Sequence, residues 1–189
     1  MRDETNVISV LMADHREFER MFGELNGLSR SDSAGREDMA QRLIAELMQH
    51  SVAEEQYLYP AARRRVPDGE RIVRHEIDEH AEAERTMREL EDVDPVDQRF
   101  DVLVHQLADE ILHHVEDEEE ELFPLLQEHG DDAELRDLGR EVLAAKKAAP
   151  TRPHPSMPDT PPLNKLAGAG AGLVDRLRDA LTGRGGHGK

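Results

Sequence analysis

The stretch HSVAEEQYLYP, from His50 to Pro60, returns in altered form as HHVEDEEEELFP, from His113 to Pro124. When His50 is aligned with His114, both stretches follow the pattern His-x-x-x-Glu-Glu-x-x-Leu-aromatic-Pro. A histidine and a glutamate four positions apart lie one turn apart on the same face of a helix. The repeat therefore predicts two helices that each bring one imidazole and one carboxylate to a common place.

The composition is typical of an acidic, helical protein. The 189 residues carry a net charge of -18, and only 3% of them are aromatic. The absence of cysteine excludes disulfides, thiolate metal ligands and a cysteine nucleophile. The negative charge argues against nucleic acid as a partner, because phosphates would be repelled. With no apolar run near the ~18 residues that span a membrane and no signal peptide at the start, we expect a cytoplasmic protein without a transmembrane segment.

Apolar residues recur with the 3.6-residue period of amphipathic helices through most of the chain. The connections between the first four helices are short, which favours antiparallel neighbours. The predicted fold is therefore all-α: an up-down-up-down four-helix bundle with a short fifth helix and an extended C-terminal tail. The predicted helices run from Thr5 or Asn6 to about Gly27, over 36–62, over 69–91, from the cap at Asp94-Pro95 onward, and over 132–149.

The charge divides the chain into two parts. Residues 1–144 contain 39 of the 42 acidic residues, whereas all four lysines follow them. Six prolines fall between Pro150 and Pro162, a density that excludes a helix there. We predict a metal-binding bundle over residues 1–149 and a basic, Pro/Gly-rich tail over 150–189. The tail is expected to form a short amphipathic helix near 171–182 and to contact the bundle or an unknown protein.

Each of the four apolar stripes is interrupted by polar residues that face inward with it. Successive residues turn about 100° around a helix, so His114 lies within about 20° of Leu107, whereas His113 lies about 120° away. No lysine or arginine occupies the inward positions. The interruptions hold His15 on the first helix, His50 and Glu54 on the second, Glu76, His80 and Glu84 on the third, and His114 and Glu118 on the fourth.

Buried carboxylates without a positive partner are costly, and two of them repel each other. A cation would neutralise them, with neutral imidazoles completing its coordination. Two carboxylates and four or five other donors suit a pair of ions that the carboxylates bridge. Nitrogen and oxygen donors without sulfur favour iron, with manganese and zinc as alternatives. The competing interpretation is a set of solvated His–Glu pairs, which we expect for His15 with Glu19 and for His75 with Glu79.

The set of motifs resembles the hemerythrin-like, or HHE cation-binding, family over about residues 5–145. The resemblance implies an up-down four-helix bundle with a non-haem di-iron centre, and the basic tail is similar to those of some actinobacterial members. The matching residues are His15, His50-x-x-x-Glu54, His80 and His114-x-x-x-Glu118, followed by LYP and LFP. The family implies that Glu54 and Glu118 bridge the irons, that the iron with an open position is bound by His15 and His50, and that the other is bound by His80 and His114.

The chain departs from the oxygen-carrying hemerythrins in two places. They have a histidine one turn before the inner histidine of the third helix, where this chain has Glu76, a seventh candidate ligand. Their last carboxylate is an aspartate five residues after its histidine, whereas Glu118 follows His114 by four. A more anionic site favours Fe(III), so oxidation by oxygen or peroxide is favoured over reversible oxygen carriage.

We therefore predict a protein with two iron ions that binds or senses oxygen, peroxide or nitric oxide, in a stress response. One alternative is a di-iron enzyme that turns over peroxide or nitric oxide. Another is an iron-handling or structural helical protein. Beyond the metal ligands the sequence offers no dedicated general acid or base, so no catalytic residue is assigned and sensing is favoured over catalysis.

Overall fold

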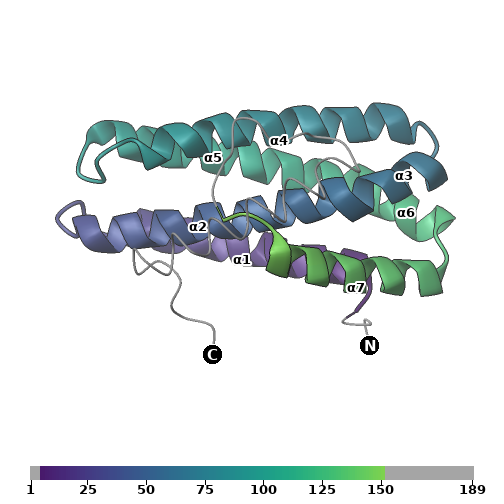
Figure 1. Ribbon diagram of the computed structural model, residues 1–189. Helices are drawn as coiled ribbons and strands as arrows, with labels where there is room; N and C mark the ends of the chain where they lie inside the picture. Colours follow the sequence, from purple (N-terminus) through teal and green to yellow (C-terminus); the bar gives the residue numbers. More distant parts are fainter. Residues whose placement is uncertain (1–4, 152–189) are drawn as a thin grey trace.

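Most of the described part of the chain is helical. A computed structural model describes residues 5–151, which contain no β-strand (Figure 1). This confirms the predicted all-α bundle. None of the helices in this range is long and apolar enough to cross a membrane. In chain order the elements are α1 (Val7–Gly27), α2 (Ser33–Ala53), the π-helical turn η1 (Glu54–Leu58), α3 (Tyr59–Arg65), α4 (Gly69–Glu91), α5 (Gln98–Asp117), the π-helical turn η2 (Glu118–Leu122), α6 (Phe123–His129) and α7 (Asp132–Ala148).

The bundle consists of four rods joined by short turns. The rods are α1, then α2 with η1 and α3, then α4, and finally α5 with η2 and α6. Helix α1 packs against α2, and α4 packs against α5, which lie side by side above α1 and α2 in Figure 1. The predicted second helix, 36–62, corresponds to residues 33–65, and the third has the predicted limits of 69–91.

Side-chain caps mark the starts of α1, α2, α5 and α7, and one start expected from the sequence needs correction. The side chain of Asn6 accepts a hydrogen bond from the backbone N–H of Ile8 at 3.0 Å, as expected for the cap of the first helix. The expected start of the fourth helix at Asp94-Pro95 is wrong, because α5 starts at Gln98 and is capped by Asp97. Asp94 instead closes a turn in front of the helix, using the same kind of hydrogen bond.

The two copies of the repeated stretch each contain a π-helical turn. The backbone N–H of Tyr59 donates to the carbonyl of Glu54, five residues earlier, and Phe123 donates to Glu118 in the same way. A proline follows in both copies and has no N–H to donate. The π turn adds one residue to the turn, so it changes which side chains after the glutamate face the core.

A polar layer divides the apolar core into two clusters. On every rod, the inward-facing polar residues lie in sequence between members of the two clusters. Apolar side chains therefore cover the polar layer from both ends of the bundle. One cluster includes Phe18, Phe22, Leu47, Met87 and Leu107. The other includes Leu11, Leu58, Val73, Leu122 and Val142.

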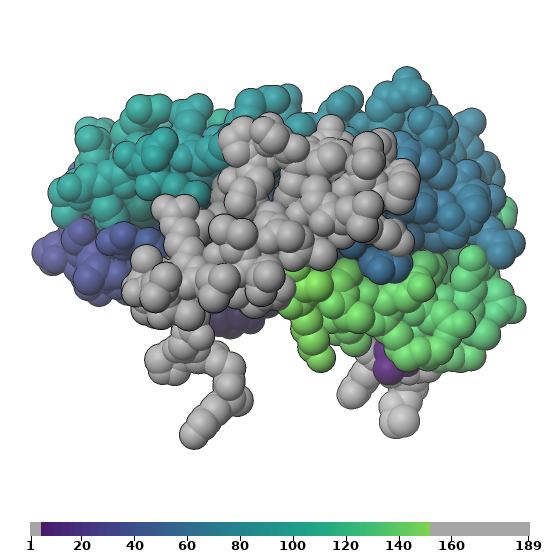
Figure 2. Space-filling view, in the orientation of Figure 1, coloured from purple at the N-terminus to yellow at the C-terminus, as the bar shows by residue number. Residues whose placement is uncertain are grey.

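The fifth helix, α7, packs against α1, α2 and η1. It buries Leu135, Leu138 and Val142, as predicted. Gly139 permits this close approach, because a Cβ at that position would collide with the backbone of Thr5. Figure 2 shows α7 (green) beneath α3 and α4 (blue) at the same end of the molecule. The predicted tail and its amphipathic helix lie outside the described residues.

Candidate metal centre

The polar layer brings together all seven residues that the sequence singled out as ligands. They come from all four rods of the bundle, and none is more than 7% exposed. Charged residues are rarely buried to this degree unless they are paired or bind a metal. The seven are His15, His50, Glu54, Glu76, His80, His114 and Glu118.

Glu54, the first residue of η1, lies between histidines of two different helices. Its Oε1 atom is 3.0 Å from His50 Nε2, and its Oε2 atom is 3.4 Å from His80 Nε2. The two oxygens of one carboxylate therefore face opposite sides of the layer.

Glu118, the first residue of η2, occupies the corresponding position in the second copy of the repeat. Its Oε2 atom lies 3.5 Å from His15 Nε2 and 4.0 Å from His114 Nε2. The imidazole rings form two pairs, His15 with His50 and His80 with His114, with centroids 5.1 Å and 4.7 Å apart. Both glutamates thus connect one histidine pair with the other.

Several buried polar atoms of the layer form no hydrogen bond of acceptable geometry within the described residues, although some of them lie close to a nitrogen or an oxygen of a neighbour. They are Nε2 of His15 and His50, both carboxylate oxygens of Glu54, and Oε2 of Glu76 and of Glu118. An unsatisfied buried polar group costs about 1–3 kcal/mol, and more when it is charged. Cations bound between these atoms would satisfy them, since imidazole and carboxylate together bind iron, manganese and zinc.

The donor atoms converge in three overlapping buried groups, one of which contains Glu76, His114 and Glu118. Another contains His15, His50, Glu54 and Glu118, and the third contains Glu54, His80 and His114. Within each group the donor atoms lie within 4.8 Å of one another. The residues present therefore fit a pair of neighbouring cations.

The Hemerythrin family, described as the hemerythrin HHE cation binding domain, matches residues 6–126, a range that includes the whole layer. The chain belongs to this family. This confirms the predicted family and the cation-binding nature of the bundle. The actinobacterial affinity of the tail is not covered by this match and stays a prediction.

Two proteins similar in sequence to this chain have different descriptions. A hemerythrin-like protein of Schizosaccharomyces pombe is 25% identical over 178 residues, which cover 94% of this chain and 87% of that protein. A DNA nickase of Nostoc is 27% identical over 145 residues, which cover 77% of this chain but 40% of the nickase. No solved structure matches the chain.

Four further carboxylates surround the polar layer, and no common role was assigned to them from the sequence. Each forms a hydrogen bond with the outer nitrogen, Nδ1, of one histidine. When a carboxylate accepts the Nδ1 proton, Nε2 is left free to bind a cation. The pairs are Glu119 with His15 at 2.9 Å, Asp14 with His50 at 3.1 Å, Glu55 with His80 at 3.0 Å, and Glu79 with His114 at 3.1 Å.

These outer carboxylates make the same contacts in the two halves of the bundle. The first half consists of α1 and the rod that begins with α2, and the second half consists of α4 and the rod that begins with α5. Asp14 and Glu79 each directly precede the first histidine of their half and hold its second histidine. Glu55 and Glu119, the second glutamates of the repeat, each hold the first histidine of the opposite half. The sequence signal was therefore present, as an acidic residue directly before His15 and His80 and directly after Glu54 and Glu118.

The two halves differ at Asp14 and Glu79, in what contacts the carboxylate oxygen that does not face a layer histidine. Lys146 of α7 reaches Asp14, with Nζ 2.6 Å from Oδ1. The other oxygen of Asp14 contacts His50. Although burial raises the pKa of Asp14, His50 and Lys146 outweigh this effect and hold that pKa below its ordinary value.

Tyr59 is a second feature that sequence reasoning missed, since the aromatic residue was expected only to pack. Its hydroxyl is fully buried, 3.1 Å from His80 Nε2, and donates to Glu118 Oε1 at 3.3 Å. Phe123 is its counterpart in the second half, and its ring stacks on His15 with centroids 5.7 Å apart. The layer therefore has a hydroxyl on the side of His80 and an apolar ring on the side of His15.

Carboxylates raise the pKa of the histidines that they contact. Burial alone lowers the pKa of His50, but Glu54 and Asp14 raise it to about 9. The pKa values of His80 and His114 are also raised by neighbouring carboxylates, against the effect of burial. Cations that bind the imidazoles must therefore compete with protons.

Glu76 contacts His114 at Nδ1, whereas Glu54 and Glu118 contact the layer histidines at Nε2. The Oε2 atom of Glu76 lies 2.9 Å from Nδ1 of His114, the outer nitrogen of that ring. Burial raises the pKa of Glu76, and the Glu118 carboxylate adds to the effect although His114 opposes it. Glu84, which the sequence also placed in the third interruption, is only partly buried and pairs with Arg88 at 2.6 Å.

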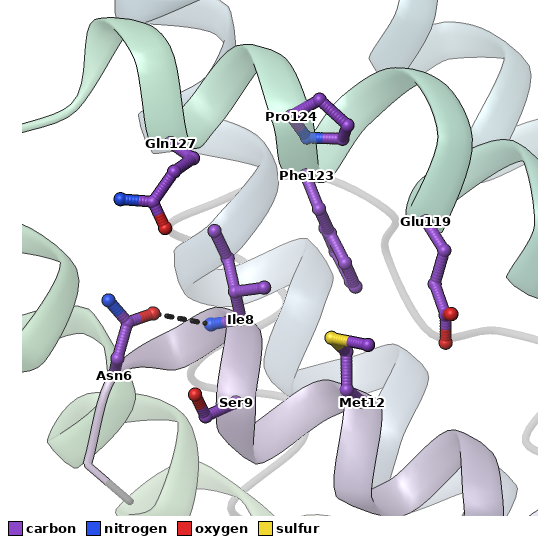
Figure 3. A pocket seen from close by; sticks show the side chains of 8 residues that line it. All are labelled: Asn6, Ile8, Ser9, Met12, Glu119, Phe123, Pro124 and Gln127. Atoms are coloured by element: carbon purple, nitrogen blue, oxygen red, sulfur yellow. Dashed lines mark hydrogen bonds between the residues drawn. The ribbon is translucent and has the colours of Figure 1, made fainter. Parts of the chain in front are cut away.

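A pocket of about 370 Å³ opens beside the layer, between the start of α1 and α6 (Figure 3). Glu119, Phe123 and Met12 project into it. His15 does not line the pocket, but it is contacted by two of the residues that do: Glu119 is hydrogen-bonded to His15 and Phe123 is stacked on it. Its lining consists of Asn6, Ile8, Ser9, Met12, Glu119, Phe123, Pro124 and Gln127.

Proposed function

We propose that the bundle holds two iron ions and that this pair binds a small oxidant, namely oxygen, peroxide or nitric oxide, as a sensor in a stress response. The observation that carries the proposal is the position of Glu54 and Glu118. Each lies between one histidine pair and the other, as a carboxylate that bridges two ions would.

The histidine pairs suggest how the ligands divide between the ions. We assign His15 and His50 to one ion and His80 and His114 to the other. Glu54 and Glu118 would be shared by both ions, and Glu76, which lies in one group with His114 and Glu118, would be a seventh ligand. Iron is preferred for this nitrogen and oxygen donor set, with manganese and zinc as alternatives.

The iron pair, when bound, supplies the redox chemistry toward the small ligand. The protein residues hold the imidazoles through Nδ1, shield them with the two apolar clusters, and leave a pocket that Glu119 and Phe123 separate from His15. That histidine belongs to the ion for which the family implies an open position. A diatomic molecule or peroxide is small enough to enter this pocket.

A link from the layer to α7 favours sensing. Lys146 contacts Asp14, which holds His50, so a change around that histidine reaches α7 through two polar contacts. The proposed tail, residues 150–189, follows this helix directly. We infer that the tail contacts the bundle or another protein, that the protein acts in the cytoplasm, and that its acidic charge argues against nucleic acid as a partner.

A di-iron enzyme is the second candidate, and Tyr59 favours it. The hydroxyl of Tyr59 lies within the layer, where it could give a proton to an atom bound beside Glu118 or His80. Turnover of peroxide or nitric oxide would use such a donor, whereas simple binding would not need it.

One experiment tests the proposal and separates the two candidates. The full chain is loaded with Fe(II) without oxygen, its iron content is measured, and it is then exposed to oxygen, peroxide or nitric oxide under optical spectroscopy. Two irons per chain and a stoichiometric spectral change support sensing, and continuous consumption of peroxide or nitric oxide supports an enzyme. Failure to bind iron, or iron that responds to none of the three, would overturn the proposal.

A further inference from the structure

A second group of potential metal ligands lies on the surface, outside the buried layer. It consists of His75 and Glu79 on α4 and His113 and Asp117 on α5. The two histidine side chains are 52% and 65% exposed, so a solvated ion can reach them. Each helix contributes a histidine and a carboxylate four positions apart, the spacing used inside the bundle by the repeated stretch.

Three donor atoms of this surface group already converge. His75 Nε2 lies 3.1 Å from Asp117 Oδ2 and 3.6 Å from Glu79 Oε1. Ligand atoms about 2.0–2.1 Å from a tetrahedral zinc ion are roughly 3.3 Å from one another, so these separations bracket the expected value. His113 lies outside this converging group, at its rim, with Nε2 3.8 Å from Glu79 Oε1 and Nδ1 4.0 Å from Asp117 Oδ1, and is the nearest candidate for a fourth donor.

The first half of the bundle shows which kind of group contacts the carboxylate oxygen that corresponds to Glu79 Oε1. Asp14 is the counterpart of Glu79, since both precede the first inner histidine and hold the second one. One oxygen of Asp14 contacts His50, and the other contacts the positively charged amine of Lys146. In the first half, the second oxygen of the Asp14 carboxylate is therefore paired with a positive charge.

In the second half, histidines take the place of that lysine. Oε2 of Glu79 contacts His114 and its Oε1 faces His75 and His113. The positions that correspond to His75, His113 and Asp117 in the first half are Val10, Gln49 and Ala53, which could not bind an ion together. The surface group is therefore specific to the α4–α5 side.

We propose that His75, Glu79, His113 and Asp117 form a surface site for a divalent transition-metal ion such as Zn²⁺ or Fe²⁺. A donor set of two imidazoles and two carboxylates binds such ions in preference to Mg²⁺ or Ca²⁺, which favour oxygen donors alone. The bound ion occupies the place beside Glu79 that the amine of Lys146 occupies beside Asp14. Because Glu79 also holds His114, one carboxylate separates this ion from the buried layer. The site does not depend on which metal the buried layer binds.

The test compares zinc binding by the iron-loaded full chain and three variants, all without a histidine tag. The first variant is His75→Ala/His113→Ala, and the second is Asp117→Asn, which keeps the side-chain shape. The matched control is His105→Ala. It lies two turns earlier on α5, is exposed and precedes Asp109 by four residues, yet it joins no group of donors within the described residues.

We expect wild type and His105→Ala to bind one zinc ion per chain in addition to their iron, as measured by equilibrium dialysis and elemental analysis. The double variant should bind zinc at least roughly tenfold more weakly, because loss of even an outer-shell partner costs about 10–100-fold. Asp117→Asn should fall between them. Iron content should be the same in all four proteins, so a failed iron assay would count against the buried site alone. Equal zinc affinity of wild type and the double variant, no added zinc in wild type, or zinc gained only with loss of iron would overturn the proposal.

Discussion

The hydroxyl of Tyr59 lies 3.1 Å from His80 Nε2, inside the polar layer and away from solvent. Tyr59→Phe removes this hydroxyl and leaves the ring in place. We expect about 1 kcal/mol less stability, from the lost buried hydrogen bond to Glu118, and an unchanged iron content. The optical spectrum of the iron-loaded protein, or its rate of peroxide consumption, should change because a polar group beside the ligands is gone. The chain has one other tyrosine, Tyr57, and Tyr57→Phe should leave spectrum and rate unaltered. Identical spectra and rates for Tyr59→Phe and wild type would contradict this role.

Two adjacent histidines on α5 provide a matched pair for the buried site. His114 is 3% exposed and belongs to the layer, whereas the side chain of His113 is 65% exposed. His114→Ala leaves Glu76 and Glu118 poorly compensated, so we expect loss of iron and a destabilisation of about 3–5 kcal/mol, the usual cost of a buried charge that loses its partner. His113→Ala should keep its iron and its melting temperature. Equal loss of iron in both variants would show that the proposed ligand set is wrong.

The outer carboxylates should act on metal affinity without being ligands. Glu119→Gln removes the charge that holds His15 Nδ1 but preserves the size of the side chain. We expect two ions per chain but an affinity lower by about 10–100-fold, the typical effect of losing such a partner. Glu120→Gln, at the exposed neighbouring position, serves as the control and should bind as wild type does. Affinities can be compared by competition with a chelator. An unchanged affinity in Glu119→Gln would show that His15 is held by packing alone.

The raised histidine pKa values predict how pH affects the gain in stability from metal. In the metal-free protein, the pKa of His50 is about 9, above its unfolded value of about 6.5. Its proton therefore adds stability below about pH 6.5, and that contribution is lost as pH rises toward 9. Asp14 and Glu54 are the carboxylates that face this ring.

Metal binding has the opposite dependence, because it requires the imidazole without its added proton. The difference in melting temperature between iron-loaded and chelator-treated protein should therefore grow from pH 6.5 to pH 9. Circular dichroism on both forms measures it. A difference that shrinks over this range, or a melting temperature that does not respond to metal removal, would contradict the linkage.

Helix periodicity was sufficient to place the seven predicted residues in one layer. Turns of about 100° per residue distinguish His114 from His113 without any knowledge of the partner helices. The start of α5 could not be obtained in this way, because Asp94 and Asp97 are both good caps and only the turn between them selects the second.

The contacts that depend on two helices at once were not predictable. The chain has 42 acidic residues, and only the packing of the rods determines that Glu55 meets His80 and Glu119 meets His15. The direction of the Tyr59 hydroxyl depends on the π turn, which a following proline does not by itself specify. The role of each layer residue as a metal ligand stays a prediction, for which the variants above are the test.

The boundary between bundle and tail makes a last prediction. Helix α7 belongs to the bundle, because it buries Leu135 and Val142 and reaches the layer through Lys146 and Asp14. A chain that ends at Thr151 keeps all of these contacts, so we expect it to retain the iron, the spectrum and the melting temperature of the full protein. A chain that ends at Gly130 lacks α7 and should lose both stability and iron affinity. It exposes the apolar surface that the helix covers, at about 25 cal/mol per Å², and leaves Asp14 without its amine. Iron analysis and thermal melting of the two truncated proteins measure the contrast. Loss of iron from the chain that ends at Thr151 would mean that the tail is part of the metal-binding domain.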